Sequence, residues 1–566
     1  MCGIVGYAGN NETACGKPLE VCLQGLERLE YRGYDSAGVA LTAPGMDKVV
    51  VRKKAGRLKN LVEDIERKPM PLATVGIGHT RWATNGEPSD VNAHPHTSMD
   101  GKVAIIHNGI IENASQLRFD LQAEGYRFAS ATDTEVAAKL LGKIVDKIIA
   151  DEGKPDLFKA VRRMARMLEG AFTILATDCR QPDIVVGARH DSPLVVGLGE
   201  GENFLGSDVA AFVAYTKRAM EVDQDQAVCV SADKVIVTDF DGNVVENPKT
   251  YTVDWDASAA EKGGWDSFMD KEIHEDPAAV QRTLLGRFDT NGGITLDEVR
   301  IDEHDFKAID KIIVVACGTA SYAGQVAKYA IEHWVRIPVE IELAHEFRYR
   351  DPILTPRTLV VAISQSGETM DTLMALRHAR EQGSKVLAIC NTQGASIPRE
   401  SDAVLYTHAG PEVAVASTKA FVAQITAAYL LGLYLAQVKG AMFRDEIHQV
   451  LDSLKDMPRK IQWVLDTQPK TIQAAAERMV NANSFLFLGR HVGYPVALEG
   501  ALKLKEIAYT FTEGFAAGEL KHGPIALVDE GEPVVFIVPP QRGRNVLHAK
   551  VISGIEEVKA RGAYII

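Results

Sequence analysis

The chain is 566 residues long, with 46% hydrophobic and 24% charged residues and a formal net charge of −14. This length exceeds what one hydrophobic core serves, so we expect two to four domains. The acidic balance argues against a nucleic-acid surface, which needs a basic patch, and no apolar run approaches the roughly 20 residues that span a bilayer.

Residues 2–250 combine many short strand-like runs with a few helical patterns. Strands this frequent predict layered antiparallel sheets with covering helices, an α+β arrangement. The strand-like runs lie at residues 4–7, 37–41, 74–78, 103–107, 171–177, 184–188 and 235–239. The helical patterns lie at residues 17–29, 113–124, 132–149 and 156–167.

Residues 251–300 are acidic and irregular, and they contain the run DWDASAAEKGGWDS. We interpret them as a linker that carries one helix, at residues 277–285. From residue 301 onward, buried strands alternate with helices, as in KIIVVACG and TLVVAISQSGE, whose helices follow at 321–334 and 369–382. This alternation is typical of a doubly wound parallel sheet.

The strand–glycine–helix pattern then recurs in SFLFLGRHVGYPVALEGALKLKEI, followed by the apolar strand PVVFIVPP. Long helices predicted at residues 417–435 and 443–457 separate the two units. We therefore expect two tandem α/β domains, at residues 301–440 and 441–566, the second of them truncated.

The cysteines are scattered, odd in number and without CxxC spacing, which favours reduced cytoplasmic thiols over disulfides or a zinc site. They are Cys2, Cys15, Cys22, Cys179, Cys229, Cys317 and Cys390. A metal site is one interpretation of His94 and His96 in NAHPHT, but without a further Cys/His cluster we favour a structured loop. Runs of the type GxxxxGK[ST] or GxGxxG are missing, and we expect no metal, nucleotide or organic cofactor.

Cys2 becomes the N-terminal residue once Met1 is removed, and it then carries a thiol beside a free α-amine. An α-amine titrates near ~7.7–8.0, so it can take the thiol proton and later protonate leaving ammonia. Position alone is weak evidence for catalysis. The residues that follow in the sequence strengthen it.

Three polar runs accompany Cys2 in the first 135 residues. Arg81 in HTRWATNG offers a fork suited to a carboxylate, although a surface ion pair would explain it equally well. Asn108 and Gly109 in HNGIIEN could stabilise an oxyanion or form a hairpin turn. Asp133 in TDTE could receive an ammonium or cap a helix.

Together with CGIVGY and EYRGYDSAG, these runs resemble the N-terminal-nucleophile glutaminase domain of class II amidotransferases, an αββα sandwich. The resemblance covers residues 2–250 and implies that Cys2 attacks the glutamine carboxamide while Asn108 and Gly109 form the oxyanion hole. It assigns glutamine binding to Arg81, Trp82, Thr84 and Asp133. The family loop usually has His at the position of Asn85, so a role of that imidazole is not carried over.

In the second half, Ser364, Gln365, Ser366 and Thr369 surround a predicted helix N-terminus, which is a ready anion site. Plain helix capping is the alternative. In ALEGALKLKEI, Glu499, Lys503 and Glu506 fall on one helix face while Lys505 points away. That trio suits proton movement between sugar carbons, or forms an ordinary salt-bridged face.

SQSGET, VASTKAF, EGALKLKE and ELKHGP in this order resemble the tandem sugar-isomerase (SIS) domains of the isomerising glutamine–fructose-6-phosphate aminotransferase family. The resemblance implies L-glutamine and D-fructose 6-phosphate as substrates, with Val415 and Ser417 lining the sugar site. It makes Glu506 the isomerisation base, Lys503 its electrostatic partner and His522 the ring-opening residue. Since that histidine reaches into the neighbouring subunit's site in the family, a homodimer is implied.

Two departures and two rivals complete this interpretation. Ala320 stands where some members have serine, and ISGIEEVKARGAYII stops without the tail whose lysine the family uses. We therefore also consider a glutaminase-competent fragment without synthase activity. Another class II amidotransferase would need a pyrophosphate or ATP loop, and a non-enzymatic sugar-phosphate sensor would not need the Cys2 site.

Overall fold

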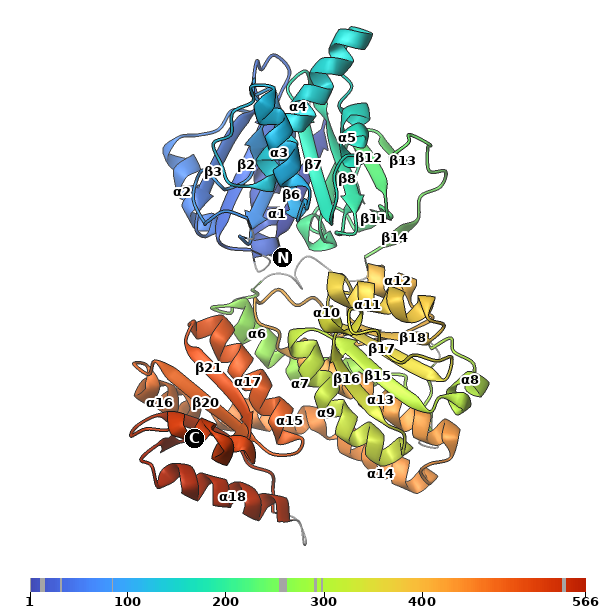
Figure 1. The fold of residues 1–566 in the computed structure, drawn as a ribbon, viewed down its shortest axis with the longest axis vertical. Coiled ribbons are helices and arrows are strands. Elements are labelled where there is room, and N and C mark those ends of the chain that lie inside the picture. Colours follow the sequence, from blue (N-terminus) through green and yellow to red (C-terminus); the bar gives the residue numbers. More distant parts are fainter. Residues whose placement is uncertain are drawn as a thin grey trace. The chain divides into compact units, whose positions relative to one another are not determined.

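The computed structural model describes residues 2–10, 16–30, 33–83, 85–253, 262–289, 293–296, 299–541 and 546–566. Contacts divide the chain into two compact units, Met1–Glu261 and Lys262–Ile566 (Figure 1). Each unit is described by itself below.

The first unit contains two sheets in which all paired strands are antiparallel. The eight-stranded sheet has the order β14-β11-β9-β10-β1-β4-β2-β3, with β1 Gly3–Gly9, β2 Ser36–Thr42, β3 Val50–Ala55, β4 Val75–Arg81, β9 Val195–Leu198, β10 Glu202–Gly206, β11 Arg218–Glu221 and β14 Thr250–Thr252. The six-stranded sheet has the order β13-β12-β8-β7-β6-β5, with β5 His96–Thr97, β6 Val103–Gly109, β7 Phe172–Asp178, β8 Gln181–His190, β12 Gln226–Ser231 and β13 Val235–Asp239.

Successive side chains of a strand point to opposite faces of its sheet, and both faces of each sheet are covered, which gives four layers. Ile4 and Ala8 of β1 join Leu175 and Val185 of the other sheet in one buried cluster, so the two sheets face each other. Val5 packs on the opposite side of β1, among residues of the first two helices. The helices are α1 Lys17–Leu29, α2 Leu58–Arg67, α3 Ala114–Ala123, α4 Asp133–Glu152 and α5 Leu157–Ala165. With α4 and α5 packed on the outer face of the six-stranded sheet, the predicted αββα sandwich is confirmed.

The second unit contains two sheets whose paired strands are all parallel. The five-stranded sheet has the order β16-β15-β17-β18-β19, with β15 Lys311–Ala316, β16 Val339–Leu343, β17 Thr358–Ser364, β18 Lys385–Cys390 and β19 Ala403–Tyr406. The four-stranded sheet has the order β21-β20-β22-β23, with β20 Ser484–Gly489, β21 Phe511–Ala516, β22 Pro533–Ile537 and β23 Tyr564–Ile565. Two parallel sheets confirm the expected tandem α/β domains.

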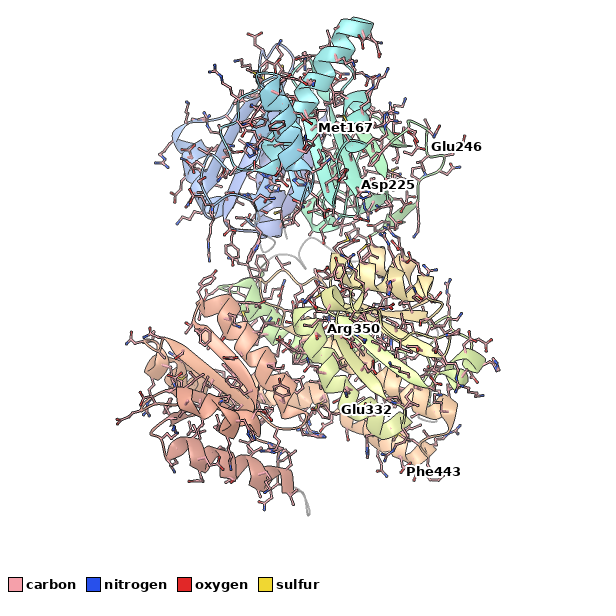
Figure 2. All side chains as sticks on the ribbon, viewed as in Figure 1. Met167, Asp225, Glu246, Glu332, Arg350 and Phe443 are labelled. Atoms are coloured by element: carbon pink, nitrogen blue, oxygen red, sulfur yellow. The ribbon has the colours of Figure 1, made fainter. Side chains whose placement is uncertain are left out.

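Helices surround these sheets: α6 Phe268–His274, α7 Asp276–Leu284, α8 Glu303–Ala308, α9 Gly318–Val335, α10 Ala344–Phe347, α11 Met370–Glu381, α12 Ser396–Glu400, α13 Lys419–Lys439, α14 Arg444–Lys455, α15 Met457–Thr467, α16 Pro469–Met479, α17 Gly493–Ala508 and α18 Val546–Lys559. The helix expected at 277–285 is α7, and α6 precedes it within the predicted linker. Phe443, labelled in Figure 2, is 78% exposed at the N-cap of α14.

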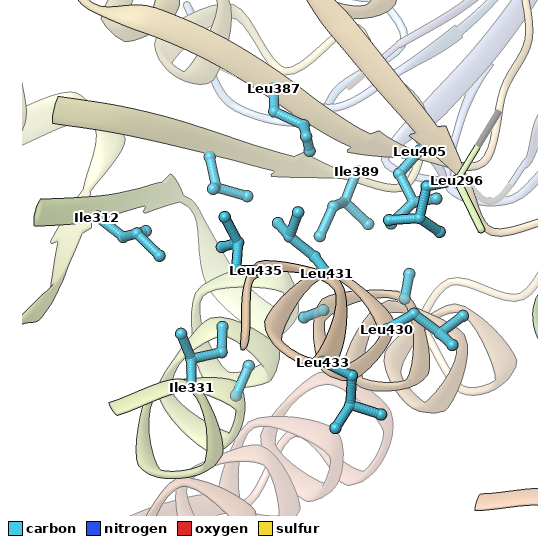
Figure 3. Packing of buried hydrophobic residues seen from close by; sticks show 14 of the residues in the cluster. Leu296, Ile312, Ile331, Leu387, Ile389, Leu405, Leu430, Leu431, Leu433 and Leu435 are labelled. Atoms are coloured by element: carbon cyan, nitrogen blue, oxygen red, sulfur yellow. The ribbon is translucent and has the colours of Figure 1, made fainter. Parts of the chain in front are cut away.

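The α13 helix corrects one expectation from the sequence. It is 21 residues long and apolar enough to cross a membrane by length and composition, so the statement that no apolar run reaches that length is wrong. Its Leu431 and Leu435 belong to the buried cluster that includes Ile312 and Ile389 of the parallel sheet (Figure 3). The burial of these side chains identifies α13 as the core helix of the second unit.

Candidate active sites

The Cys2 thiol lies against the end of β4, which places it beside Trp82. Its Sγ is 3.2 Å from Trp82 N, whose N–H points at the sulfur, and 3.6 Å from Trp82 O. Burial raises the pKa of the Cys2 thiol, while the Trp82 N–H and the Arg81 charge oppose that rise. Both opposing groups stabilise the thiolate, the form that acts as a nucleophile.

Asn108 is oriented by contacts on both sides of its amide. Its Nδ2 donates to Cys2 O at 2.9 Å, and its Oδ1 lies 3.0 Å from Nε2 of His79, a fully buried residue of β4. The same Nε2 lies 2.9 Å from His107 O. Burial lowers the pKa of His79 to about 3, so the ring is neutral and its Nε2–H is the donor to both oxygens. This contact turns Nδ2 of Asn108 toward Cys2.

Gly109 occupies the last position of β6 with a φ of 114°. A Cβ at this position would lie 2.0 Å from Ala171 O, so only glycine fits. The strand therefore ends with a backbone N–H next to the Asn108 amide. That pair can serve as two donors to one oxyanion.

Arg81 is 3% exposed, and its guanidinium is held at one end only. Its Nη2 donates to Asn85 O and, at 3.0 Å, to Gly86 O. Its Nη1 is buried and has no hydrogen-bond partner in the described part of the chain. A buried, unpaired charged donor is costly unless a ligand accepts from it, so this nitrogen is suited to bind an anionic group.

The α4 helix begins at Asp133 as the TDTE run predicts. The Thr132 side chain caps it by accepting from Glu135 N at 3.3 Å. The Asp133 carboxylate accepts from Ile111 N at 3.0 Å and from Thr134 N at 2.9 Å. Asp133 is thus a fixed, buried carboxylate, and it also acts electrostatically on Arg81.

Of the remaining first-unit residues, Trp82 is 43% exposed and makes an edge contact with Tyr34 at 5.3 Å between ring centroids. Thr84 lies outside the described residues. His94 and His96 are buried, and His96 opens β5, which confirms the structured loop expected for NAHPHT.

The second site begins at the carboxyl end of β17. Ser364 Oγ lies 3.0 Å from Thr369 Oγ1 and accepts from Gly367 N at 3.0 Å, while Ser366 Oγ accepts from Glu368 N at 3.2 Å. Gln365 O accepts from the Asn391 and Thr392 N–H groups. Thr369 is the N-cap residue of α11, so this compact loop ends at a helix N-terminus, as the sequence predicts.

Val415 and Ser417 lie in the loop that precedes α13. Val415 is 49% exposed, and Ser417 Oγ donates to Glu412 at 2.9 Å. Glu412 also accepts from Thr418 N and Ala420 N, at 2.8 and 3.1 Å. This carboxylate therefore fixes the loop at its junction with the helix.

The predicted trio on α17 forms one connected network. Lys503 Nζ lies 2.8 Å from Glu506 and 3.5 Å from Glu499, while Lys505 is exposed. The Thr319 hydroxyl of α9 accepts from Lys503 at 3.0 Å and donates to Glu499 at 3.1 Å. Burial raises the pKa of Glu499 to about 7, with Lys503 and Thr319 opposing. A carboxyl group that titrates near neutrality, an ammonium and a second carboxylate are suited to proton transfer.

The sequence did not indicate Thr319, and it indicated Glu499 only as a member of the charged trio on one helix face. Thr319 stands in the first turn of α9. Its partner Glu499 is 180 residues away, so this contact depends on the packing of α17 against α9. His522 ends a short 3-10 helix, Glu519–His522, and is exposed.

Comparisons with known proteins match both units. A family model described as "Glutamine amidotransferase domain" matches residues 79–214, and one described as "SIS domain" matches residues 306–434 and 478–566. Curated proteins named glutamine–fructose-6-phosphate aminotransferase [isomerizing] are similar over the whole chain. Those of Corynebacterium diphtheriae and Streptomyces coelicolor are 62% and 59% identical over 100% of this chain, and 90% and 89% of their own lengths are covered.

Among solved structures, one similar protein is an isolated C-terminal domain. The C-terminal domain of glucosamine-fructose-6-phosphate aminotransferase from Francisella tularensis superposes with a TM-score of 0.51 at 40% identity. The match covers 54% of this chain and 84% of that one.

Proposed function

The chain belongs to the family of isomerizing glutamine–fructose-6-phosphate aminotransferases, and we propose that its two units divide the reaction between them. The first unit hydrolyses glutamine to glutamate and ammonia. The second accepts that ammonia, passed on within the protein, and converts D-fructose 6-phosphate to D-glucosamine 6-phosphate. This is the first step of hexosamine biosynthesis.

In the first unit, Cys2 is the nucleophile once Met1 has been removed. Its Sγ attacks the carboxamide carbon, the thiol proton passes to the α-amine, and that proton then leaves with ammonia. Water cleaves the resulting thioester and releases glutamate. The oxyanion receives hydrogen bonds from Asn108 Nδ2 and Gly109 N–H, of which a single one is typically worth ~10²–10³ in rate.

The amino-acid end of glutamine binds between Arg81 and Asp133, with Trp82 and Thr84 beside it. The observation that carries this proposal is the buried Nη1 of Arg81, which has no hydrogen-bond partner in the described part of the chain. A substrate carboxylate supplies that partner. Asp133 supplies the opposite charge for the α-ammonium group.

In the second unit, the sugar phosphate binds at the N-terminus of α11, to Ser364, Gln365, Ser366 and Thr369. The residues that line the sugar itself are Val415 and Ser417. We assign Glu506 as the base that moves a proton between adjacent sugar carbons, Lys503 as the cation that stabilises the enediolate, and His522 as the ring-opening residue.

Two variants test this division. Cys2→Ala is expected to abolish glutamine hydrolysis while keeping amino-sugar formation from added ammonia. Glu506→Gln is expected to do the reverse, retaining glutamine hydrolysis and losing amino sugar by either nitrogen source. Glutamate and glucosamine 6-phosphate are measured separately, and loss of both products in either variant contradicts the assignment.

We also propose that the enzyme is a homodimer in which His522 acts in the neighbouring subunit's site. Support comes from α15 and α16, in which no residue is buried. They expose Trp463 and Ile472, and Val480 is exposed at the C-cap of α16. Co-expressed His522→Ala and Glu506→Gln chains should then regain activity that each lacks alone. This recovery requires dimers that contain one chain of each variant. If the co-expressed chains stay inactive, His522 does not act in the neighbouring subunit's site.

The predicted domain limits remain part of the proposal: a glutaminase domain at 2–250, a linker at 251–300, and two sugar-isomerase domains at 301–440 and 441–566. We also propose that the protein is cytoplasmic. It is supported by the described cysteines, which are all free thiols.

A further inference from the structure

Three side chains with metal-binding atoms converge at one edge of the five-stranded sheet. Cys317, His345 and Asp371 each offer one ligand atom, and these atoms all lie within 4.8 Å of one another. Cys317 Sγ lies 4.0 Å from His345 Nδ1. None of the three takes part in the reaction proposed above.

The fold itself brings the three ligands together. Cys317 follows β15 and caps α9, His345 follows β16 in α10, and Asp371 lies in the first turn of α11. Because β15, β16 and β17 are parallel neighbours, the elements that follow their carboxyl ends meet at the same edge. The ligands are 28 and 26 positions apart in the sequence, which hides this arrangement from any short-motif search.

Burial raises the pKa of the Cys317 thiol, and three hydrogen-bond donors around the sulfur oppose that rise. The backbone N–H groups of Ala344 and His345 and the hydroxyl of Thr372, 3.9 Å away, all point at Cys317 Sγ. Such donors are the outer partners that metal-bound thiolates use. The Asp371 carboxylate lies within 4.8 Å of the same sulfur, so a dication placed between the two atoms would attract both.

Geometry also limits what could bind. Four-coordinate Zn²⁺ holds sulfur at ~2.3 Å and nitrogen or oxygen at ~2.0–2.2 Å, so its ligands stand roughly 3.5 Å apart. The ligand atoms of the three side chains would have to move about 1 Å closer together to reach this separation. His345 can provide it, because its side chain is 45% exposed. The same exposure leaves a fourth coordination position open to solvent.

We propose that Cys317, His345 and Asp371 form a binding site for one thiophilic divalent cation, of which Zn²⁺ is the natural example. A thiolate, an imidazole and a carboxylate form a ligand set that suits Zn²⁺ and Co²⁺ and disfavours Mg²⁺ and Ca²⁺. Binding exchanges the Cys317 thiol proton for the metal ion and releases that proton to solvent. Because Asp371 is two residues after Thr369, the bound cation would stand next to the proposed phosphate loop.

Cobalt titration tests the site directly. We would use the Cys2→Ala protein, because the Cys2 thiol with its neighbouring amine is itself a potential ligand pair. One equivalent of Co²⁺ is expected to give tetrahedral d–d absorption and a thiolate-to-cobalt charge-transfer band, and Zn²⁺ should displace both. Adding Cys317→Ser should remove the charge-transfer band. His345→Gln or Asp371→Asn should weaken Co²⁺ binding at least about tenfold.

Cys229→Ser in the same Cys2→Ala background is the matched control, since it removes a partly exposed thiol of the first unit and should leave the spectrum unchanged. The exposed position of His345 keeps His345→Gln from disturbing the core, and near-ultraviolet circular dichroism checks that every variant is folded. A missing charge-transfer band at millimolar Co²⁺, or one that persists after Cys317→Ser, overturns the proposal.

Discussion

At the scale of single residues, His79 orients Asn108 without any need to touch the substrate. It is a neutral imidazole that donates from Nε2 to Asn108 Oδ1. Without that donor, the amide can rotate by 180° and present its oxygen to the developing oxyanion. His79 is therefore a positioning residue whose loss should affect the transition state more than glutamine binding.

We predict that His79→Phe lowers kcat for glutamine hydrolysis by about 10–100-fold with little change in KM. The reason is that the Asn108 donor contributes a factor of ~10²–10³ to the rate only when its N–H is oriented toward the oxyanion. His79→Gln, whose amide can still donate, should recover part of this loss. Ammonia-dependent synthesis is the internal control, and His190→Gln is the control for a histidine outside the site. An unaltered kcat in His79→Phe would show that Asn108 needs no such support.

The raised pKa of Glu499 predicts that the stability of the second unit depends on pH. Its folded pKa of about 7 lies above the 4.5 of an ordinary glutamate, so the folded state holds the proton more tightly than the unfolded state. The resulting stability is complete below about pH 4.5 and is lost as the pH rises through about 7. Glu499→Gln mimics the protonated form and should lack this loss.

Urea unfolding of the second unit at pH 5 and pH 8 measures the effect. Relative to the parent, Glu499→Gln should gain about 1–3 kcal/mol in unfolding free energy between these pH values. Lys503 keeps Glu506 as an ion-pair partner 2.8 Å away, so the substitution leaves no unpaired ammonium. Glu477→Gln on α16, an exposed position, is the control, and an equal gain there would refute the role of burial.

At the scale of elements, Gly367 determines the shape of the loop between β17 and α11. It has a φ of 67°, and a Cβ there would lie 2.6 Å from Ala395 Cβ and 2.8 Å from Cys390 Sγ. Gly367→Ala should shift the loop and raise KM for fructose 6-phosphate about tenfold or more, with glutamine hydrolysis unaffected. A change of this size corresponds to about 1.4 kcal/mol or more of lost binding.

Gly383→Ala separates backbone strain from loop displacement. Gly383 has a similar φ of 83°, but nothing lies within 4 Å of its added Cβ. Both alanine variants therefore carry the cost of a left-handed backbone, while only Gly367→Ala forces neighbours apart. Steady-state kinetics with fructose 6-phosphate should distinguish them, and equal KM values would exclude a steric role for the loop.

The elements that could be predicted are those with strong periodicity. The helices at 17–29 and 132–149 and the buried strands of the parallel sheets stand where the apolar spacing indicates. The α15 and α16 helices could not be found this way, because no residue of either is buried within the chain. Short strands such as β9 and β11 could not be predicted for a different reason. Each has four residues, which is too few to show a recognisable alternation of apolar and polar side chains.

The residues of the candidate sites also differ in whether the sequence could predict them. Cys2, Arg81 and Asp133 could be proposed from sequence, because each stands in a run whose side chains have a recognisable chemistry. The hydrogen bond of Thr319 with Glu499 and the meeting of Cys317 with His345 and Asp371 could not, since both depend on packing between distant elements. A contact across 180 residues leaves no periodic trace in the sequence.

At the scale of the whole molecule, the division into Met1–Glu261 and Lys262–Ile566 predicts two separate unfolding events. Each unit has its own buried clusters: Leu175 lies in the cluster between the two sheets of the first unit, and Leu431 lies in the main cluster of the second. Leu→Ala at a fully buried position costs about 2–5 kcal/mol, and that cost stays within the unit that holds the cavity.

Hydrogen exchange followed by mass spectrometry in increasing urea measures this for both units at once. Leu175→Ala should lower the urea midpoint of peptides from the first unit only, and Leu431→Ala that of peptides from the second unit only. Glutamine hydrolysis by Leu431→Ala should consequently survive at urea concentrations that abolish amino-sugar formation. If either variant lowers both midpoints equally, the units unfold as one cooperative body, and the two half-reactions could not be lost independently.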